Sequence, residues 1–233
     1  MLQASIKHIT IVLFAAALLL NPFTANAAKD KDGPDLVPIK IKLPPPLFIG
    51  TPKNIRRPNL ERQTGKPRGP FLAPKGTENV SVGKPVTASD DLPVIGEVDY
   101  ITDGDKDGSD GSYVEFGFDV QHVTIDLEKV HEMYAIIIWH YHQQARVYID
   151  CIVQVSDDPE FEEGVTTVFN NDHDNTAGLG AGTDKEWIEV NTGKLLDTKG
   201  VQGRYVRLYS NGNTSNDLNH YIEVEVWGER AKK

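Results

Sequence analysis

An Asp- and Gly-rich run near the middle of the chain has the residue types and spacing best suited to chemistry. Asp103, Asp105 and Asp107 stand at alternate positions, and Gly108 follows them. Carboxylates spaced in this way, on a loop that glycine allows to turn tightly, can direct several oxygens at one Ca²⁺. The twelfth position of the run is Val114, where an EF-hand needs Glu, so the sequence excludes an EF-hand. A solvated turn without a metal is the alternative.

A second group of chemically capable residues is His140, Tyr141 and His142, with Arg146 close behind. Fixed hydrogen-bond donors beside an aromatic ring suit a sugar, because sugars present both hydroxyl groups and apolar C–H faces. The two histidines could instead chelate Zn²⁺, since residues two apart on a strand point to the same face. No third zinc ligand accompanies them. Mutual satisfaction of Arg146 and the histidines at a strand end is the purely structural alternative.

The remaining polar segments carry weaker signals. The loops 170–175 and 211–217 could bind glycan hydroxyls or a second cation, and they also have the composition of ordinary turns. The Gly-rich run 178–182 lacks the lysine and the helix of a phosphate-binding loop. Ser, His and Asp are present without any motif that would position a catalytic triad, so the sequence does not predict an enzyme.

The elements that must position these residues are short β-rich segments separated by Gly, Asn and Asp. Their number and the turn signals between them predict an all-β, antiparallel β-sandwich. The segment Ile136–Trp139 is apolar on both faces, which is typical of a central strand covered on each side. The expected strands are 79–89, 113–116, 122–127, 133–142, 146–156, 165–169, 186–190, 204–210 and 221–227.

Five segments together resemble the discoidin family, also called coagulation factor 5/8 type C domains. They are 101–105, 123–127, 153–158 and the two closing strands 204–209 and 223–228. The resemblance covers roughly 79–228 and implies a galactose-binding-like jelly roll that binds glycans, lipid headgroups or proteins and is rarely catalytic. It also implies a structural Ca²⁺ between Asp103 and Glu223, with Asp105 and Asp107 as further ligands. A sugar pocket is implied around Arg146, His140 or His142, with an aromatic ring such as Tyr141.

The first residues predict export. Lys7, an apolar stretch over 9–20 and Ala25-Asn26-Ala27 form the three regions of a secretory signal peptide, 1–27. We therefore expect a secreted, periplasmic or cell-envelope protein with no membrane span after cleavage, and an uncleaved anchor is the alternative. Cys151 is the single cysteine, so no internal disulfide can form, and its place within an apolar strand predicts a small buried hydrophobe.

Residues 28–78 form a Pro-rich basic linker ahead of a domain at 79–233. Ten of the fourteen prolines lie between Pro34 and Pro74, which predicts an extended, partly polyproline segment. Ile39 and Ile41 alternate with lysines and could add a short strand to a sheet edge. Composition favours a mobile tether, and docking on the acidic domain is the alternative.

Charge divides along the same boundary. Residues 33–78 carry nine Lys or Arg against three Asp or Glu, whereas residues 79–233 carry twelve against twenty-nine. A domain so acidic argues against nucleic acid and anionic membranes as partners.

The sequence therefore predicts an exported, non-catalytic module that binds a carbohydrate of an extracellular or envelope glycan, with Ca²⁺ stabilising its loops. The alternative is a structural module whose basic N-terminal segment contacts another envelope protein. An exposed aromatic stack near Arg146 would favour the first, and an apolar patch or a docked N-terminal segment the second.

Overall fold

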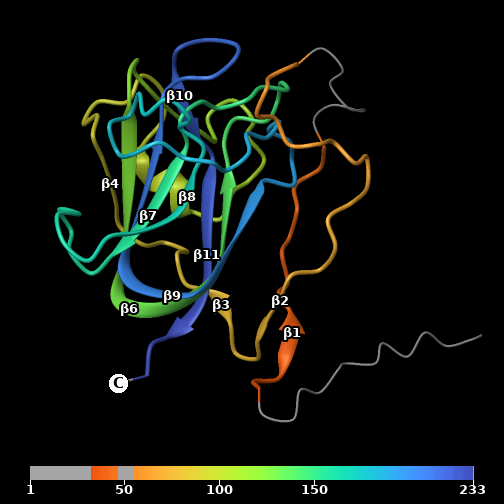
Figure 1. Cartoon of the computed structure of the whole chain (residues 1–233), viewed down its shortest axis with the longest axis vertical. Coiled ribbons are helices and arrows are strands. Elements are labelled where there is room, and N and C mark those ends of the chain that lie inside the picture. Colours follow the sequence, from red (N-terminus) through yellow and green to blue (C-terminus); the bar gives the residue numbers. More distant parts are fainter. Residues whose placement is uncertain (1–32, 47–54, 233) are drawn as a thin grey trace, which may run out of the picture. The chain divides into compact units, whose positions relative to one another are not determined.

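The computed structural model describes residues 33–46 and 55–232, and the predicted signal peptide lies outside them. The elements are β1 (Leu36–Pro38), β2 (Leu72–Pro74), β3 (Glu78–Asn79), β4 (Val86–Ala88), the 3₁₀ helix η1 (Val98–Thr102), β5 (Val114–Phe116), β6 (Gln121–Trp139), β7 (Ile152–Ser156), β8 (Thr166–Asn170), β9 (Lys194–Ser210), β10 (Asn219–Tyr221) and β11 (Glu223–Arg230). These residues contain no α-helix, which confirms the all-β prediction (Figure 1).

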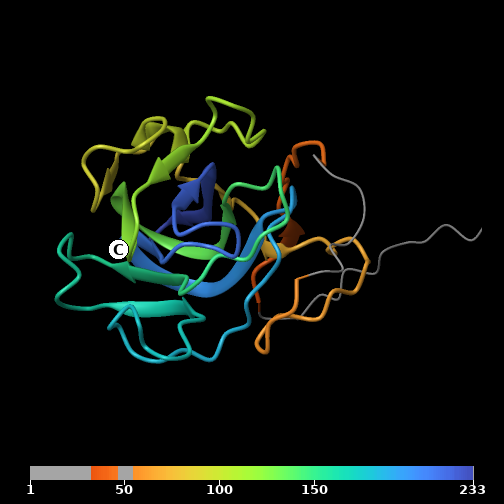
Figure 2. The same cartoon turned by 90° about the horizontal axis from the view of Figure 1, so that it is seen from above.

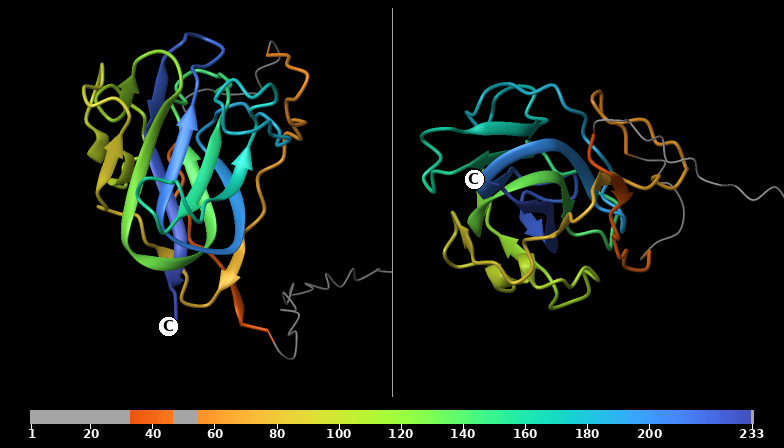
Figure 3. Two further views of the ribbon diagram at one scale, coloured as in Figure 1. Left: turned by 60° about the vertical axis from the view of Figure 1, so that its left-hand side comes forward. Right: turned by 90° about the horizontal axis from the view of Figure 1, so that it is seen from below.

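Two long strands, β6 and β9, build both layers of the sandwich. The first half of β6 pairs with β4 and with the second half of β9. Its second half pairs with β11 and with the first half of β9. The β6–β9 register shifts between Asp126 and His131, where the strands curve from one layer into the other (Figure 3). Every pair of strands is antiparallel, and the order is β3-β11-β6-β9-β7-β8 with β4 against β6.

Several predicted strand limits were wrong. The segments 122–127 and 133–142 are one strand, β6, which ends at Trp139. Hydrogen bonding to β9 continues on both sides of the bend, so no turn separates the two halves. The strand predicted for 146–156 begins only at Ile152, because Asp150 has a φ of 50°, outside the β region.

Side chains that alternate along the long strands fill the space between the layers. Val123, Ile125, Val206 and Leu208 are all buried there. Full burial of one such side chain contributes about 1.5–3 kcal/mol. Cys151 is also buried in this core as a free thiol, and burial raises its pKa well above the ordinary value. These packed residues stabilise the domain without a disulfide.

A second apolar cluster lies on the opposite face of β6. Ile136 and Ile138 belong to the main core, whereas Ile137 and Trp139 pack in the second cluster together with Trp227. The prediction that this strand is apolar on both faces and covered on both is confirmed. The cover on the second face comes from the Pro-rich segment.

We call the described part of that segment, 34–46 and 55–78, the arm. Its Ile39, Ile41 and Phe71 pack against the second cluster. The backbone of the arm, in orange, lies along one side of the sandwich (Figure 2). The predicted sheet-edge strand was wrong: β1 lies at 36–38 and pairs with β2 inside the arm. The apolar side chains that would have lined an edge strand cover the sheet face instead. The described arm is thus docked, so the mobile tether that the composition favoured was wrong and the alternative, docking on the domain, is the one observed.

Polar contacts also hold the arm. Arg57 donates two hydrogen bonds to the carboxylate of Glu186, at 2.7 and 2.6 Å. Lys194 on β9 pairs with Glu61 at 2.7 Å. Leu60 forms an isolated parallel bridge with Glu186, and this bridge is all that forms of the strand predicted for 186–190. The segment 186–190 pairs with the arm through this single bridge and forms no run of strand pairs with the sheet.

Candidate functional site

The ribbon formed by β5 and β10 positions one group of polar and aromatic side chains. Val114 and Phe116 on β5 are buried in the core, so the alternation of the strand directs Glu115 to the other face. His220 on β10 lies opposite Glu115 in the register. With Tyr113, Tyr141 and Arg146 these two residues form what we call the Arg146 cluster.

Arg146 lies at the centre of this cluster. Its guanidinium carbon lies 4.7 Å from the ring centroid of the half-buried Tyr141. Nη2 is 3.5 Å from Oε1 of the exposed Gln144, which is a weak contact. Nε and Nη1 are buried and have no acceptor among the described residues. A buried guanidinium with unpaired N–H groups is costly, so an acceptor at this point would stabilise the site.

Aromatic rings frame the guanidinium. The rings of Tyr113 and Tyr141 are 5.0 Å apart in an edge-to-face arrangement. The His220 ring lies 6.0 Å from Tyr113 and 5.7 Å from Tyr141. Tyr113 and Tyr141 are partly exposed, so their faces and edges are available for contact with an apolar surface.

Electrostatics in the cluster keep His220 neutral. Burial lowers the pKa of His220 to about 3, and the positive charge of Arg146 adds to the effect. The Nε2–H of His220 donates to Oε2 of Glu115 at 2.9 Å. Burial raises the pKa of Glu115, and Arg146 opposes that rise. The cluster thus presents a cation, a carboxylate and a fixed neutral imidazole at one place.

The two histidines next to Tyr141 lie elsewhere. His140 is buried, stacks on Tyr148 at 4.2 Å, and its Nδ1 lies 3.1 Å from Oε2 of Glu189. His142 is also buried, and its Nε2–H donates to the carbonyl of Lys106 at 2.9 Å. Both rings hold loops against the core. Their nitrogens engage different partners, so the described structure brings them to no common zinc position.

The Asp-rich loop follows η1 and folds on itself. Asp103 Oδ1 accepts from the backbone of Asp105 at 2.7 Å, and Asp105 Oδ1 accepts from Asp107 at 2.9 Å. The backbone N–H of Gly104 donates to Oε2 of Glu223 at 3.0 Å. The loop is therefore attached to the last strand. Among the described residues, no three of the four candidate ligands gather their oxygens within 4.8 Å of one another.

Among the four candidate calcium ligands, Glu223 has a buried carboxylate oxygen without a hydrogen-bond partner among the described residues. This oxygen is its Oε1, and the whole side chain is buried. Burial raises its pKa to about 9, opposed by the Gly104 N–H and assisted by the neighbouring carboxylates Glu225 and Asp103. Lys106 pairs with Glu225. An unpaired buried carboxylate oxygen beside an acidic loop fits a hard cation such as Ca²⁺.

A different acidic group does converge. Oxygens of Asp150, Asp172 and Asp174 lie within 4.8 Å of one another. Asp172 already accepts backbone N–H groups from Thr176 at 3.0 Å and Ala177 at 2.9 Å. The sequence marked the loop 170–175 as polar but gave no signal for Asp150, which a turn brings in from a distant segment.

Sequence reasoning also missed Tyr113, Glu115 and His220. The alternation over 113–116 offered a signal, because it directs Tyr113 and Glu115 away from the core. His220 gave none, since its role depends on the pairing of β10 with β5.

Comparison with known proteins gives similarities of structure only. No family model matches, and no curated protein matches. The chain is similar to the CBM32 of AlyQ in complex with 4,5-unsaturated mannuronic acid, at 21% identity over 61% of this chain and 92% of that one, with a TM-score of 0.44.

Two further solved structures are similar at the same level. One is a fucose binding module, SpX-3, of Streptococcus pneumoniae, at 20% identity over 67% of this chain and 99% of that one, with a TM-score of 0.48. The other is chitosan-binding module 1 from a chitosanase/glucanase of Paenibacillus sp. IK-5, at 19% identity over 65% and 99%, with a TM-score of 0.42. The strand pairings described above, rather than these similarities, define the fold as an antiparallel β-sandwich.

Proposed function

We propose that the protein is an exported, non-catalytic module that binds a carbohydrate of an extracellular or envelope glycan at the Arg146 cluster. The observation that carries the proposal is the buried guanidinium of Arg146, whose Nε and Nη1 have no acceptor among the described residues, with the partly exposed Tyr141 ring against it. Sugar hydroxyls are acceptors, and the C–H face of a pyranose packs on an aromatic ring. The resemblance of the sequence to discoidin domains supports the same reading.

We propose that Gln144 moves aside when the sugar binds. Gln144 is exposed and makes the only described side-chain hydrogen bond to Arg146, at the weak distance of 3.5 Å. On binding, Gln144 swings away and a pair of sugar hydroxyls takes its place. Glu115 then accepts a hydrogen bond from a third hydroxyl, while Tyr113 and Tyr141 supply the apolar contact.

The test is a glycan array with the mature protein and two arginine variants. Arg146→Lys keeps the charge but loses the planar donor set, so we expect selective binding to weaken about tenfold. Arg204→Lys is the matched control, because Arg204 also stacks on a tyrosine, Tyr205, at 4.8 Å but is paired with Asp126 away from the cluster. Equal binding by both variants, or a blank array with the wild-type protein, would count against the proposal.

We further propose that a structural Ca²⁺ binds between Asp103 and Glu223. Support comes from the unpaired Oε1 of buried Glu223 and from its attachment to the Asp-rich loop through Gly104. The ion would neutralise that carboxylate and fix the loop. Asp105 and Asp107 are exposed and would join as ligands through a modest rearrangement of the loop.

An interaction with another envelope protein is the second candidate. The observation that favours it is the docked arm, whose β1–β2 ribbon leaves Leu36 and Leu72 about half exposed, at 53% and 50%. A photo-crosslinking residue at position 36 is expected to give one discrete adduct in cells, and none at the exposed Arg62 on the same arm. Adducts at both positions, or at neither, would remove this candidate.

A further inference from the structure

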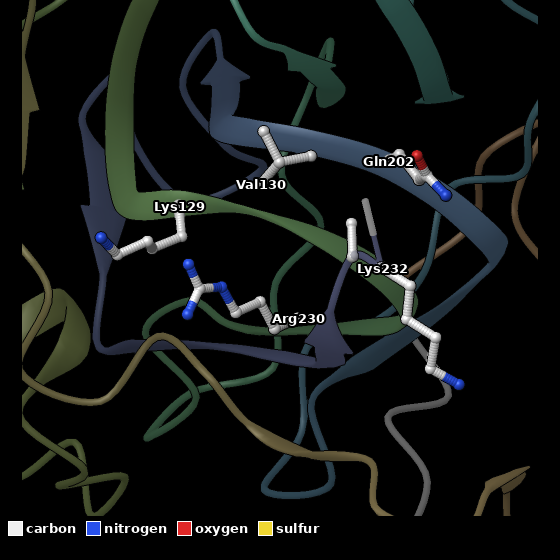
Figure 4. Close-up of a pocket in the computed structure, with 6 residues that line it drawn as sticks. Lys129, Val130, Gln202, Arg230 and Lys232 are labelled. Atoms are coloured by element: carbon white, nitrogen blue, oxygen red, sulfur yellow. The ribbon is translucent and has the colours of Figure 1, made fainter.

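A cavity of about 530 Å³ lies at the end of the domain where β6 and β9 bend. This bend and β10, which carries His220 of the Arg146 cluster, lie at opposite ends of the domain (Figure 1). We call it the Lys129 cavity. Its lining consists of three basic side chains, two small apolar ones and an amide: Lys129, Arg230, Lys232, Val130, Ala231 and Gln202 (Figure 4).

The backbone around this cavity is fixed by the sheet. Ala231 donates its N–H to the carbonyl of Val130 at 3.1 Å, directly beyond the Arg230–His131 pair of β11 and β6. Gln202 on β9 is held in register with β6 by its pairing with Glu132. The two chain segments that supply the basic side chains and the strand that supplies Gln202 therefore keep their spacing, and only the side chains themselves must adjust to a ligand.

The lining of the cavity is positively charged, whereas the domain as a whole is negatively charged. The cavity has three cations and no carboxylate, in a domain where acidic residues outnumber basic ones by more than two to one. None of Lys129, Arg230 and Lys232 forms an ion pair with another described residue. Like charges held near one another without a counter-ion repel, and an anion between them would relieve that repulsion.

The carboxylates next to Lys129 and Arg230 in the sequence bind other partners outside the cavity. Glu128 precedes Lys129 in the sequence, but its carboxylate pairs with Lys84 at 2.5 Å. Glu229 precedes Arg230 and accepts a hydrogen bond from Tyr134 at 3.4 Å. Neither carboxylate lines the cavity. The chain thus leaves the cations available although acids adjoin them in sequence.

The positions of the side chains indicate that the anion is a single oxyanion group rather than a polyanion. In Figure 4 the head groups of Lys129 and Arg230 extend to the same side of the cavity, whereas Lys232 and Gln202 lie on its other side. Val130, 36% exposed, lies between them. A single oxyanion group would contact both Lys129 and Arg230. A ring attached to that group would pack against Val130. A densely charged polyanion would be repelled by the acidic surface beyond the cavity.

We propose that the Lys129 cavity binds a single oxyanion group, a carboxylate or a sulfate, carried by a sugar. The guanidinium of Arg230 binds such a group through paired N–H donors, and the ammonium of Lys129 adds a point charge. This site is separate from the Arg146 cluster and does not depend on the sugar bound there.

The experiment is a titration of the mature protein, at low ionic strength, with inorganic sulfate, galacturonate and neutral galactose, followed by NMR shifts of the Val130 and Ala231 amides. We expect saturable shifts with sulfate or galacturonate and none at these amides with galactose. A response to galacturonate assigns the carboxylate sugar, and a response to sulfate alone assigns a sulfate group. No saturable shift with either anion would overturn the proposal.

Two charge-matched double variants separate a built site from general attraction. Lys129→Gln with Arg230→Gln removes the paired cations, and affinity should fall about tenfold or more. Arg62→Gln with Lys185→Gln removes the same charge from exposed positions outside the cavity and should leave affinity unchanged. An equal loss of affinity in both double variants would show that the anion is attracted non-specifically, and the proposal would be wrong. All four side chains are exposed, so both proteins are expected to fold.

Discussion

Arg57 and Glu186, 129 residues apart in the sequence, form a bidentate ion pair between the arm and the rest of the domain. The Glu186 side chain is only 5% exposed. Arg57→Ala would leave this buried carboxylate without its main partner, so we expect the free energy of unfolding to fall by about 2 kcal/mol. Urea denaturation of the mature protein measures the change.

Arg56→Ala is the control for this prediction, because Arg56 is the exposed neighbour of Arg57 and makes no described side-chain contact. A loss in Arg56→Ala as large as that in Arg57→Ala would show that the effect reflects general charge rather than the ion pair. An unchanged Arg57→Ala protein would show that the arm contributes little to stability.

Calcium should stabilise the protein through Glu223. Millimolar Ca²⁺ is expected to raise Tm over its value in EDTA, by about 2–4 °C for each kcal/mol of binding free energy in a domain of this size. Glu223→Gln should abolish this rise, while it removes a buried carboxylate that burial disfavours in the absence of metal. Asp110→Asn, which changes an exposed carboxylate beyond the loop, should keep the rise. The same rise in Glu223→Gln would place the ion elsewhere.

Gly108 ends the Asp-rich loop and should tolerate no side chain. Its φ is +63°, and an added Cβ would lie 2.5 Å from Cδ1 of Ile222. Gly108→Ala is therefore expected to destabilise the protein by about 1–3 kcal/mol. Gly111→Ala is the matched control, since Gly111 also has a positive φ but open space around it. Denaturation midpoints of the two variants separate the steric contact from the backbone strain, and equal losses would contradict the contact.

How far the sequence could predict this structure depends on the range of the interaction that decides each feature. Local patterns sufficed for β5, through its alternation, and for the burial of both faces of 136–139, through its continuous apolar run, because both patterns are visible within a few residues. It could not show that 121–139 is one bent strand, since that depends on continuous pairing with β9, more than fifty residues away.

The candidate sites divide in the same way. Arg146 and Tyr141 were found because they lie close together in the sequence, and the structure places the guanidinium against the ring. His220 and Glu115 were missed because only the β5–β10 register brings them together. Docking of the arm was only the alternative prediction, because a high proline content indicates an extended chain but does not show whether that chain contacts a surface.

The neutral, buried state of His220 makes stability depend on pH. Its pKa in the folded protein is lowered to about 3, whereas an unfolded histidine has its ordinary value of about 6.5. Between these values the unfolded chain binds the proton that the folded protein excludes, so the contribution of His220 to stability is complete above pH 6.5 and is lost as the pH is lowered toward 3. From pH 6.5 to 5 the loss should be about 2 kcal/mol at most, at 1.36 kcal/mol for each pH unit.

The check is urea denaturation of the wild-type protein and His220→Gln at pH 7.5 and pH 5. Gln can donate to Glu115 as the imidazole does, and it does not titrate, so the pH-dependent loss should shrink in the variant. Two other groups continue to titrate in both proteins and set the remaining slope. His122, whose pKa burial also lowers, to about 4, acts in the same direction as His220, whereas Glu223, whose pKa burial raises to about 9, acts in the opposite direction. If the two proteins lose the same stability between these pH values, His220 is not the group that excludes the proton, and the Arg146 cluster is more open to water than its burial indicates.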